Sequence, residues 1–198
     1  MGKTVDYYLA TTSPFTYLGH ARMLEMAQRH GAVLNYKPID ALDVFAVSGG
    51  LPLNQRPPQR QAYRLAELKR WRDHLGLPLN LQPQFFPVPG KLAACAVIAA
   101  MEAGADPGGL IGGILKGVWA EERNIEDPVA LRQIAVAAGY DRPEFVDRAA
   151  ESRYLQIYAA NTREAIARNV FGVPTYIVDE ELFWGQDRLE FVERALRT

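Results

Sequence analysis

Apolar and polar positions follow two different periods along this chain, and its first part favours a strand, a helix and a second strand. Residues 4–9 (TVDYYL) are rich in β-branched and aromatic side chains, which is typical of a strand. Residues 12–14 (TSP) provide a helix cap and a proline for the first turn, and Gly31 ends the predicted helix. Residues 33–39 (VLNYKPI) predict a second strand, so the chain opens with a β-α-β unit whose strands are parallel.

The middle of the chain, residues 41–170, has the spacing of helices separated by glycine and proline. Asp106-Pro107 and Asp127-Pro128 each place a capping aspartate before a proline, which predicts two helix N-termini. The paired glycines at 108–113 favour close helix packing over phosphate binding. Further helices are predicted at about 59–75, 92–103, 141–150 and 152–170.

Strand character returns near the end of the chain. Residues 175–178 (TYIV) and 182–184 (LFW) predict two short strands whose spacing suits a hairpin. Asp187 is predicted to cap a terminal helix, with Glu190 three positions later as its capping-box partner. The chain therefore closes with a β-β-α unit.

These elements predict an α/β fold in which one domain is interrupted by a second. Residues 1–40 and 171–198 form the β-α-β and β-β-α parts of the first domain, and residues 41–170 form an all-helical insertion. The chain of 198 residues is 48% hydrophobic, which is enough to bury a substantial core. The cleft between the two parts is the expected position of a site.

Charge is nearly balanced, with 22 Lys and Arg residues against 23 Asp and Glu residues and a formal net charge of −1. No broad positive field attracts nucleic acid or an anionic membrane surface. The longest strongly apolar run, at 92–101, is about half the length that a membrane span needs, and no signal-peptide pattern opens the chain. We therefore expect a soluble, cytoplasmic protein that binds neither nucleic acid nor membrane.

A single cysteine, Cys95, excludes an internal disulfide, a Cys-x-x-Cys pair and a multi-cysteine zinc site. Alanines surround it at helical spacing, so we expect a small buried side chain. His20, His30 and His74 show no ligand spacing, and no metal is predicted. The charged residues at 64–73 predict a solvated helix face.

Two short motifs carry candidate chemistry. Residues 13–16 (SPFT) lie where a strand runs into a helix, and a helix N-terminus stabilises an anion by about 0.3–1 kcal/mol when exposed. Ser13 adds a hydroxyl donor there, although this segment alone favours a plain N-cap. Residues 171–175 (FGVPT) precede a strand, and taken alone they indicate a turn with an ordinary trans proline.

In this order and spacing, the two motifs resemble the thioredoxin-fold disulfide oxidoreductases that carry a helical domain. The resemblance places Ser13 and Thr16 at the two cysteine positions and makes Pro174 the cis-proline that faces them. The variant with Ser-Pro-[Phe/Tyr] is identified as the family of 2-hydroxychromene-2-carboxylate isomerases and kappa-class glutathione transferases. The resemblance covers essentially the whole chain and rests on residues 13–18 (SPFTYL), 52–55 (PLNQ), 170–175 (VFGVPT) and 184–189 (WGQDRL).

The resemblance implies a thioredoxin-like domain that binds glutathione, which brings the thiol that the site lacks. Ser13 is then the catalytic residue, and it hydrogen-bonds and stabilises the glutathione thiolate. Asp187 has two compatible roles, as helix cap and as acceptor for the γ-glutamyl ammonium. The cofactor contacts implied are Ser13, Pro14, Phe15, Val173, Pro174, Trp184, Gly185, Gln186 and Asp187, and the substrate contacts are Asn54, Gln55, Arg56 and Phe86.

The activity implied is a glutathione-dependent interconversion of 2-hydroxychromene-2-carboxylate and trans-o-hydroxybenzylidenepyruvate in aromatic catabolism, by reversible thiolate addition. A homodimer is the family's usual assembly. Two alternatives remain: a kappa-class-like transferase or peroxidase acting on another electrophile, and a non-catalytic ligand-binding protein of the same fold. Retention on immobilised glutathione separates the enzymes from the binding protein.

The sequence departs from the naphthalene-pathway members of this family near the second strand. Those enzymes have a lysine where this chain has residues 43–45 (DVF), so a different cation is needed for the substrate carboxylate. Arg56 and Arg60 are the expected replacements. Aromatic side chains that line a pocket for a flat substrate, or alternatively belong to the core, are Tyr63, Phe85, Phe86 and Trp119.

Overall fold

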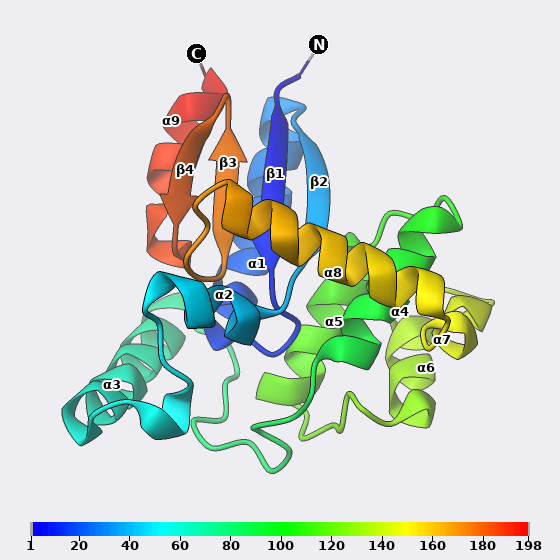
Figure 1. Ribbon diagram of the computed structural model, residues 1–198, viewed down its shortest axis with the longest axis horizontal. Helices are drawn as coiled ribbons and strands as arrows, with labels where there is room; N and C mark the ends of the chain where they lie inside the picture. The colour runs from blue at the N-terminus through cyan, green and yellow to red at the C-terminus, as the bar shows by residue number, and fades with distance from the viewer. Residues whose placement is uncertain (1, 198) are drawn as a thin grey trace.

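The computed structural model describes residues 2–197, and its centre is one mixed sheet of four strands in the order β2-β1-β3-β4 (Figure 1). Strand β1 pairs in parallel with β2, while β3 runs antiparallel to both β1 and β4. This topology confirms the predicted β-α-β and β-β-α units. The strands are β1 (Thr4–Leu9), β2 (Val33–Pro38), β3 (Thr175–Val178) and β4 (Glu181–Trp184).

Helices cover both faces of the sheet. Helices α1 and α9 pack together on one face, and α8 crosses the other face diagonally (Figure 1). Helices α2 to α8 fall between β2 and β3 in the chain, as the sequence predicts. The helices are α1 (Pro14–His30), α2 (Ala41–Ser48), α3 (Pro58–Leu75), α4 (Lys91–Glu102), α5 (Gly108–Trp119), α6 (Pro128–Ala137), α7 (Glu144–Arg148), α8 (Ser152–Ala167) and α9 (Leu189–Arg197), with 3₁₀ turns η1 (Leu53–Gln55) and η2 (Gln186–Arg188).

One hydrophobic core runs from the sheet into the helical part. Tyr7 and Tyr176 of the sheet belong to the same buried cluster as Leu110 of α5. Helix α4 is buried along residues 93–100, which include Cys95, because its alanines let neighbouring backbones approach from several sides. The predicted burial of Cys95 is therefore confirmed, and burial raises the pKa of its thiol to about 11.

Helix α5 packs against α1 and α6 through its glycines. A Cβ at Gly112 would lie 3.4 Å from the His20 ring, and one at Gly113 would lie 2.9 Å from Ile134. His20 is buried, with Nε2 2.8 Å from the Gly108 carbonyl and Nδ1 3.3 Å from the Tyr7 hydroxyl. Close packing at 108–113 and a satisfied His20 are both as predicted.

Helix starts agree with the sequence at some positions and differ at others. Asp127 caps α6 as predicted, by accepting a hydrogen bond from the Val129 amide at 2.9 Å. The predicted capping box at the terminal helix is wrong. Asp187 lies in the turn η2, where its carboxylate pairs with Arg188 at 2.7 Å, and Glu190 pairs with Arg194 instead.

Two smaller differences complete the comparison. Helix α5 begins one position later than Asp106-Pro107 suggests, although the Asp106 carboxylate still accepts from the Gly108 amide at 3.0 Å. Helix α8 ends at Ala167, three positions before the predicted 170. Among the helices of residues 2–197, none combines the length and the apolar character that a bilayer span requires.

Candidate active site

Ser13 marks the start of α1, immediately beyond the end of β1. Its extended backbone makes it the N-cap, and its Oγ accepts a hydrogen bond from the Thr16 amide at 3.1 Å. The residue is 8% exposed, and within residues 2–197 its hydroxyl hydrogen has no acceptor. Because Pro14 has no N–H, the Phe15 amide is the first donor of the helix that is left unpaired in the described chain. The N-cap interpretation is confirmed, and the hydroxyl keeps a donor to offer.

Thr16, at the other predicted cysteine position, is completely buried one turn into α1. Its Oγ1 lacks a hydrogen-bond partner among the described residues. A buried hydroxyl without a partner is costly, by about 1–3 kcal/mol. Unpaired donors therefore accumulate at this helix start, on Ser13, Phe15 and Thr16.

The loop at 171–174 lies at the same end of the sheet as Ser13. Tyr8 of β1 pairs with Thr175 of β3, so Pro174 is in register with the residue that ends β1. The Val173–Pro174 peptide bond is cis, as the resemblance implies. Val173 is only partly buried, and its backbone N–H and C=O have no partner in the part of the chain that the structure describes. An extended peptide could pair with this backbone as an added strand.

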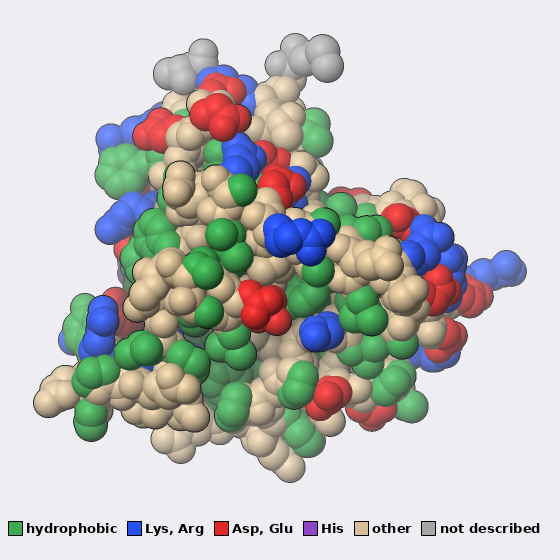
Figure 2. Space-filling view, viewed as in Figure 1, with side chains coloured by type: hydrophobic (Ala, Val, Ile, Leu, Met, Phe, Trp, Pro, Cys, Tyr) green, Lys and Arg blue, Asp and Glu red, His purple; other side chains and the backbone are tan. Residues whose placement is uncertain are grey.

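Residues 184–187 are attached to this loop. The Gly185 amide donates to the Pro174 carbonyl at 2.9 Å, and the Trp184 ring packs 4.9 Å from the Phe171 ring. A Cβ at Gly172 would collide with the Trp184 indole, so glycine is needed for this contact. Figure 2 shows hydrophobic side chains gathered over α2 and the neighbouring end of β4.

Gln186 and Asp187 have different surroundings. Gln186 is buried, and its side-chain oxygen and its carbonyl both accept from Arg22 of α1. Asp187 is exposed and lies close over Gly185, whose φ of +103° turns the chain back on itself. Gln186 therefore joins η2 to α1, while the Asp187 carboxylate is accessible to a ligand. Their cofactor roles stay predictions.

An aromatic wall stands beside the Ser13 loop. The Trp119 indole N–H donates to the Thr12 carbonyl at 3.3 Å, and the Phe86 ring lies 4.7 Å from the Trp119 ring. The loop that carries Phe86 is attached to the start of α1 because Thr11 Oγ1 donates to the Gly90 carbonyl at 3.0 Å. Trp119 is fully buried and Phe86 partly exposed, so of the two alternatives for these aromatics, Trp119 is core and Phe86 offers a free ring edge.

Arg64 lies over this wall. Its guanidinium carbon is 5.5 Å from the centre of the Phe86 ring and 5.7 Å from that of Trp119. The expected solvated face at 64–73 therefore differs at its first residue, because Arg64 is partly buried against the rings of Phe86 and Trp119. Sequence reasoning missed this residue; the available signal was its spacing of four from Arg60, which places both arginines on one side of α3.

The other predicted substrate contacts are more exposed. Asn54 and Gln55 lie on η1, and their side chains make no hydrogen bond within residues 2–197. Arg56 is partly buried, donating from Nε to the Leu51 carbonyl at 2.8 Å and lying 5.7 Å from the Phe45 ring. Arg60 is exposed. The structure thus groups Phe86 with Arg64 near Ser13, and it does not join Asn54 or Gln55 to them by any side-chain bond.

Phe85 and Tyr63 lie further out. Phe85 shares with Phe86 a surface hollow of about 400 Å³, which is also lined by Glu126. Tyr63 is 62% exposed and faces Arg70, whose guanidinium carbon is 5.7 Å from its ring. These two aromatics are not part of the wall beside Ser13.

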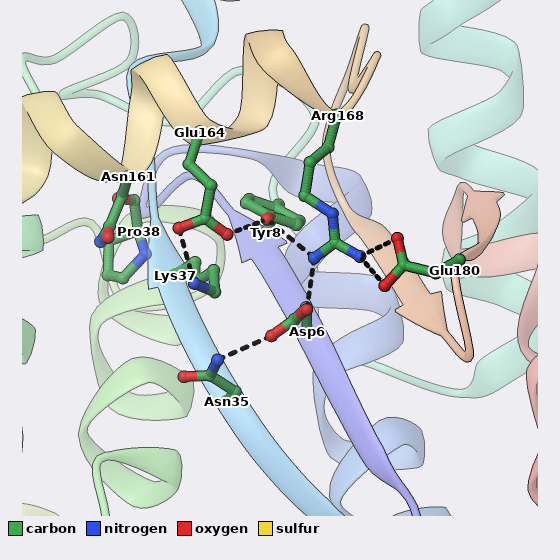
Figure 3. Close-up of polar contacts among 9 residues, drawn as sticks. All are labelled: Asp6, Tyr8, Asn35, Lys37, Pro38, Asn161, Glu164, Arg168 and Glu180. Atoms are coloured by element: carbon green, nitrogen blue, oxygen red, sulfur yellow. Dashed lines mark hydrogen bonds and ion pairs between the residues drawn. The ribbon is translucent and has the colours of Figure 1, made fainter.

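A second polar group lies on the face of the sheet that α8 covers (Figure 3). Arg168 pairs with Asp6 and makes two 3.1 Å bonds to Glu180. Glu164 accepts from Tyr8 at 2.6 Å and from Lys37 at 2.8 Å. We call these six residues the α8 network. A polar hollow of about 280 Å³ lies beside Asp6 and Arg168. Because the charged groups of the α8 network pair with one another, we interpret the network as a structural contact that holds α8 on the sheet.

Within residues 2–197, no three His, Cys, Asp or Glu side chains are placed to hold a metal ion. His30 instead contacts Glu193 at 3.0 Å. The single cysteine, Cys95, is buried within α4.

Comparison with known proteins agrees with this geometry. The DsbA-like thioredoxin domain family matches residues 4–197. A 2-hydroxychromene-2-carboxylate isomerase of Pseudomonas putida is 30% identical over 195 residues, covering 97% of this chain and 93% of that protein. One from Sphingobium xenophagum is 29% identical and covers 99% of both.

Solved structures lead to the same fold. A selenomethionine structure of 2-hydroxychromene-2-carboxylate isomerase superposes with a TM-score of 0.78 at 27% identity, covering 98% of this chain and 94% of that one. The cytosolic disulfide reductase DsbM of Pseudomonas aeruginosa, solved with GSH, gives a TM-score of 0.70 at 17% identity, covering 98% of this chain and all of that one. The predicted thioredoxin-like fold is confirmed.

Proposed function

The chain belongs to the DsbA-like thioredoxin domain family and, within it, to the 2-hydroxychromene-2-carboxylate isomerases; from this premise we propose that it is a glutathione-dependent isomerase of 2-hydroxychromene-2-carboxylate-type substrates. One observation carries the glutathione dependence. Ser13 presents a free hydroxyl donor at a helix N-terminus beside the cis-Pro174 loop, and the chain has no thiol of its own there.

The residues present fit a thiol-bearing tripeptide. The unpaired Val173 backbone suits the extended part of such a peptide, and the exposed Asp187 carboxylate suits its ammonium group. The Ser13 hydroxyl and the Phe15 amide converge on the helix N-terminus, where a negative charge is favoured. These contacts support the cofactor residues predicted around Ser13, Val173 and Asp187.

Glutathione, when bound, supplies a thiol that adds reversibly to the substrate as thiolate and leaves again. A thiol with an ordinary pKa near 8.5 is only a few per cent ionised at pH 7, so the site must favour the charged form. Ser13 does this by donating a hydrogen bond, and the α1 dipole adds up to about 2 kcal/mol in a partly buried site. Pro174 and Gly185 fix the loop that holds the peptide opposite Ser13.

The test is conversion of 2-hydroxychromene-2-carboxylate, followed by absorbance, with far less glutathione than substrate. We expect product in large excess over the glutathione supplied, because an isomerisation regenerates it. Product limited to the glutathione added would instead identify a transferase. Ser152→Ala, an exposed serine at the start of α8, is the matched control for Ser13→Ala.

Binding is measured separately from turnover. Glutathione at 100 times its Kd raises the free energy of unfolding by about 2.7 kcal/mol, which a thermal melt detects. No shift in Tm at millimolar glutathione would contradict both enzyme functions and favour a ligand-binding protein. Homodimer formation and a cytoplasmic location stay predictions, and sedimentation of the purified chain tests the first.

A further inference from the structure

Three arginines at residues 56–64 lie close enough together for their charges to interact, Arg56 with Arg60 and Arg64 with Arg56. We call Arg56, Arg60 and Arg64 the arginine cluster. Within residues 2–197, none of the three forms an ion pair with a carboxylate. Further along α3, by contrast, Arg70 pairs with Glu67 and Arg72 with Asp73. Because the chain as a whole has a net charge of −1, three successive cations without acidic partners concentrate positive charge in this segment.

Arg64 is the least solvated member of the arginine cluster. It makes no hydrogen bond with any residue of the described chain, and it is partly buried over the rings of Phe86 and Trp119. Burial, and secondly the nearby charge of Arg56, lower the pKa of Arg64 to about 10. The guanidinium therefore stays charged at neutral pH while several of its donors lack acceptors.

Contacts within the fold connect this guanidinium to the reacting centre. Trp119, beneath Arg64, donates to the carbonyl of Thr12, the residue that precedes Ser13. Phe86 flanks the same guanidinium and is partly exposed. A flat substrate in contact with the thiol bound at Ser13 can thus lie along the Phe86 ring and direct an anionic group to Arg64.

We propose that Arg64 is the residue of the substrate site that binds the carboxylate of the ligand. Arg64 presents a planar fork of donors that matches a carboxylate in two parallel hydrogen bonds. Arg56 adds a second positive charge, and Phe86 packs against the ring of the ligand. In this role, Arg64 of α3 supplies the cation for the substrate carboxylate that a lysine at 43–45 would otherwise supply. The inference rests on the proposed function for its link to catalysis, and its binding chemistry is tested independently.

The experiment compares two unreactive probes by calorimetry, 1-naphthoate and the uncharged 1-naphthamide. In the wild-type protein loaded with glutathione, we expect naphthoate to bind at least about tenfold more tightly, because a hydrogen-bonded charge pair is formed. Arg64→Gln should remove this preference and leave glutathione affinity within about twofold. Lys69→Gln, which removes one exposed charge from the same helix, should keep the preference.

Arg64→Met is the second variant, for use if Arg64→Gln fails to fold. The methionine side chain preserves the apolar packing over Trp119. The wild-type comparison of the two probes needs no variant at all. Equal binding of naphthoate and naphthamide by the wild type, or a preference that survives in either folded variant, overturns the role of Arg64. If glutathione does not bind but the Arg64-dependent preference remains, the proposed function fails and the anion site stands.

Discussion

The α8 network and the Ser13 end of the molecule differ in whether their polar groups have partners within the protein. In the α8 network, Arg168 binds both Asp6 and Glu180, so its charge is neutralised by the protein itself (Figure 3). At the Ser13 end, the Ser13 hydroxyl and the Arg64 guanidinium have no acceptor within residues 2–197. Paired groups contribute to holding α8 on the sheet, whereas unpaired donors are suited to a ligand. Variants should therefore separate stability from activity.

Ser13→Ala should have the largest effect on activity. Removing a donor that stabilises a developing or bound anion lowers kcat by about 10²–10³-fold. The lost N-cap should also reduce the free energy of unfolding by about 1 kcal/mol. Steady-state kinetics and urea unfolding measure the two changes. Ser13→Thr keeps a hydroxyl and the cap, so a Thr variant as inactive as Ala would contradict the donor role.

Arg168→Met should have the largest effect on stability. It removes the ion-pair partner of Asp6, whose side chain is 21% exposed and then keeps only the hydrogen bond from Asn35, and it costs about 1–3 kcal/mol. For a domain of this size, Tm should fall by about 2–4 °C per kcal/mol. The value of kcat/KM measured well below Tm should stay within about twofold of wild type. Arg163→Met, an exposed arginine of α8 close to Arg168, is the control. A loss of kcat/KM well beyond twofold in Arg168→Met would contradict a purely structural role for the α8 network.

Trp119→Phe should affect both properties, because this side chain links the core to the Ser13 loop. The substitution removes the hydrogen bond to the Thr12 carbonyl and leaves unfilled volume, which costs about 1–2 kcal/mol. A severalfold rise in KM for the aromatic carboxylate is expected as the wall beneath Arg64 loosens. Trp71→Phe is the matched control. The same KM for the aromatic carboxylate in the two variants would contradict a role for Trp119 in the site.

Glu164→Gln should give the smallest effect, visible as a pH dependence of stability. Burial opposes ionisation of Glu164, but hydrogen bonds from Lys37 and Tyr8 outweigh it, so its pKa lies below the ordinary value. Its contribution is therefore present above about pH 4.3, the unfolded pKa, and is lost as pH falls through the folded pKa. Urea unfolding at pH 7 and in acid should show the gap between wild type and variant closing; a constant gap would contradict this origin.

Much of the fold could be predicted because the relevant signals are local. The strand at 4–9, the cap at Ser13 and the glycine at 31 lie within one short segment, and each acts on its neighbours alone. The capping box at Asp187 failed for a reason that is not local. Gln186 is held by Arg22, a residue 164 positions away, and the chain between β4 and α9 forms the turn η2 instead.

The site could be predicted only where ordered motifs mark it. Ser13 and Pro174 were found through the spacing and order of their motifs, since nothing within either segment brings them together. Arg64 was missed because its burial depends on the rings of Phe86 and Trp119, which belong to later segments of the chain. The pairing of Asp6 with Arg168 spans 162 positions, and no pattern along the chain indicates it.

The central claim is that this chain activates a thiol that it does not contain. The most direct measurement is a titration of the thiolate absorbance of glutathione bound to the wild-type protein and to Ser13→Ala. We expect a bound thiol whose pKa lies about two units or more below 8.5 in the wild type and returns toward that value in Ser13→Ala. A bound thiol that titrates near 8.5 in the wild type, or equally low in both proteins, would contradict this claim.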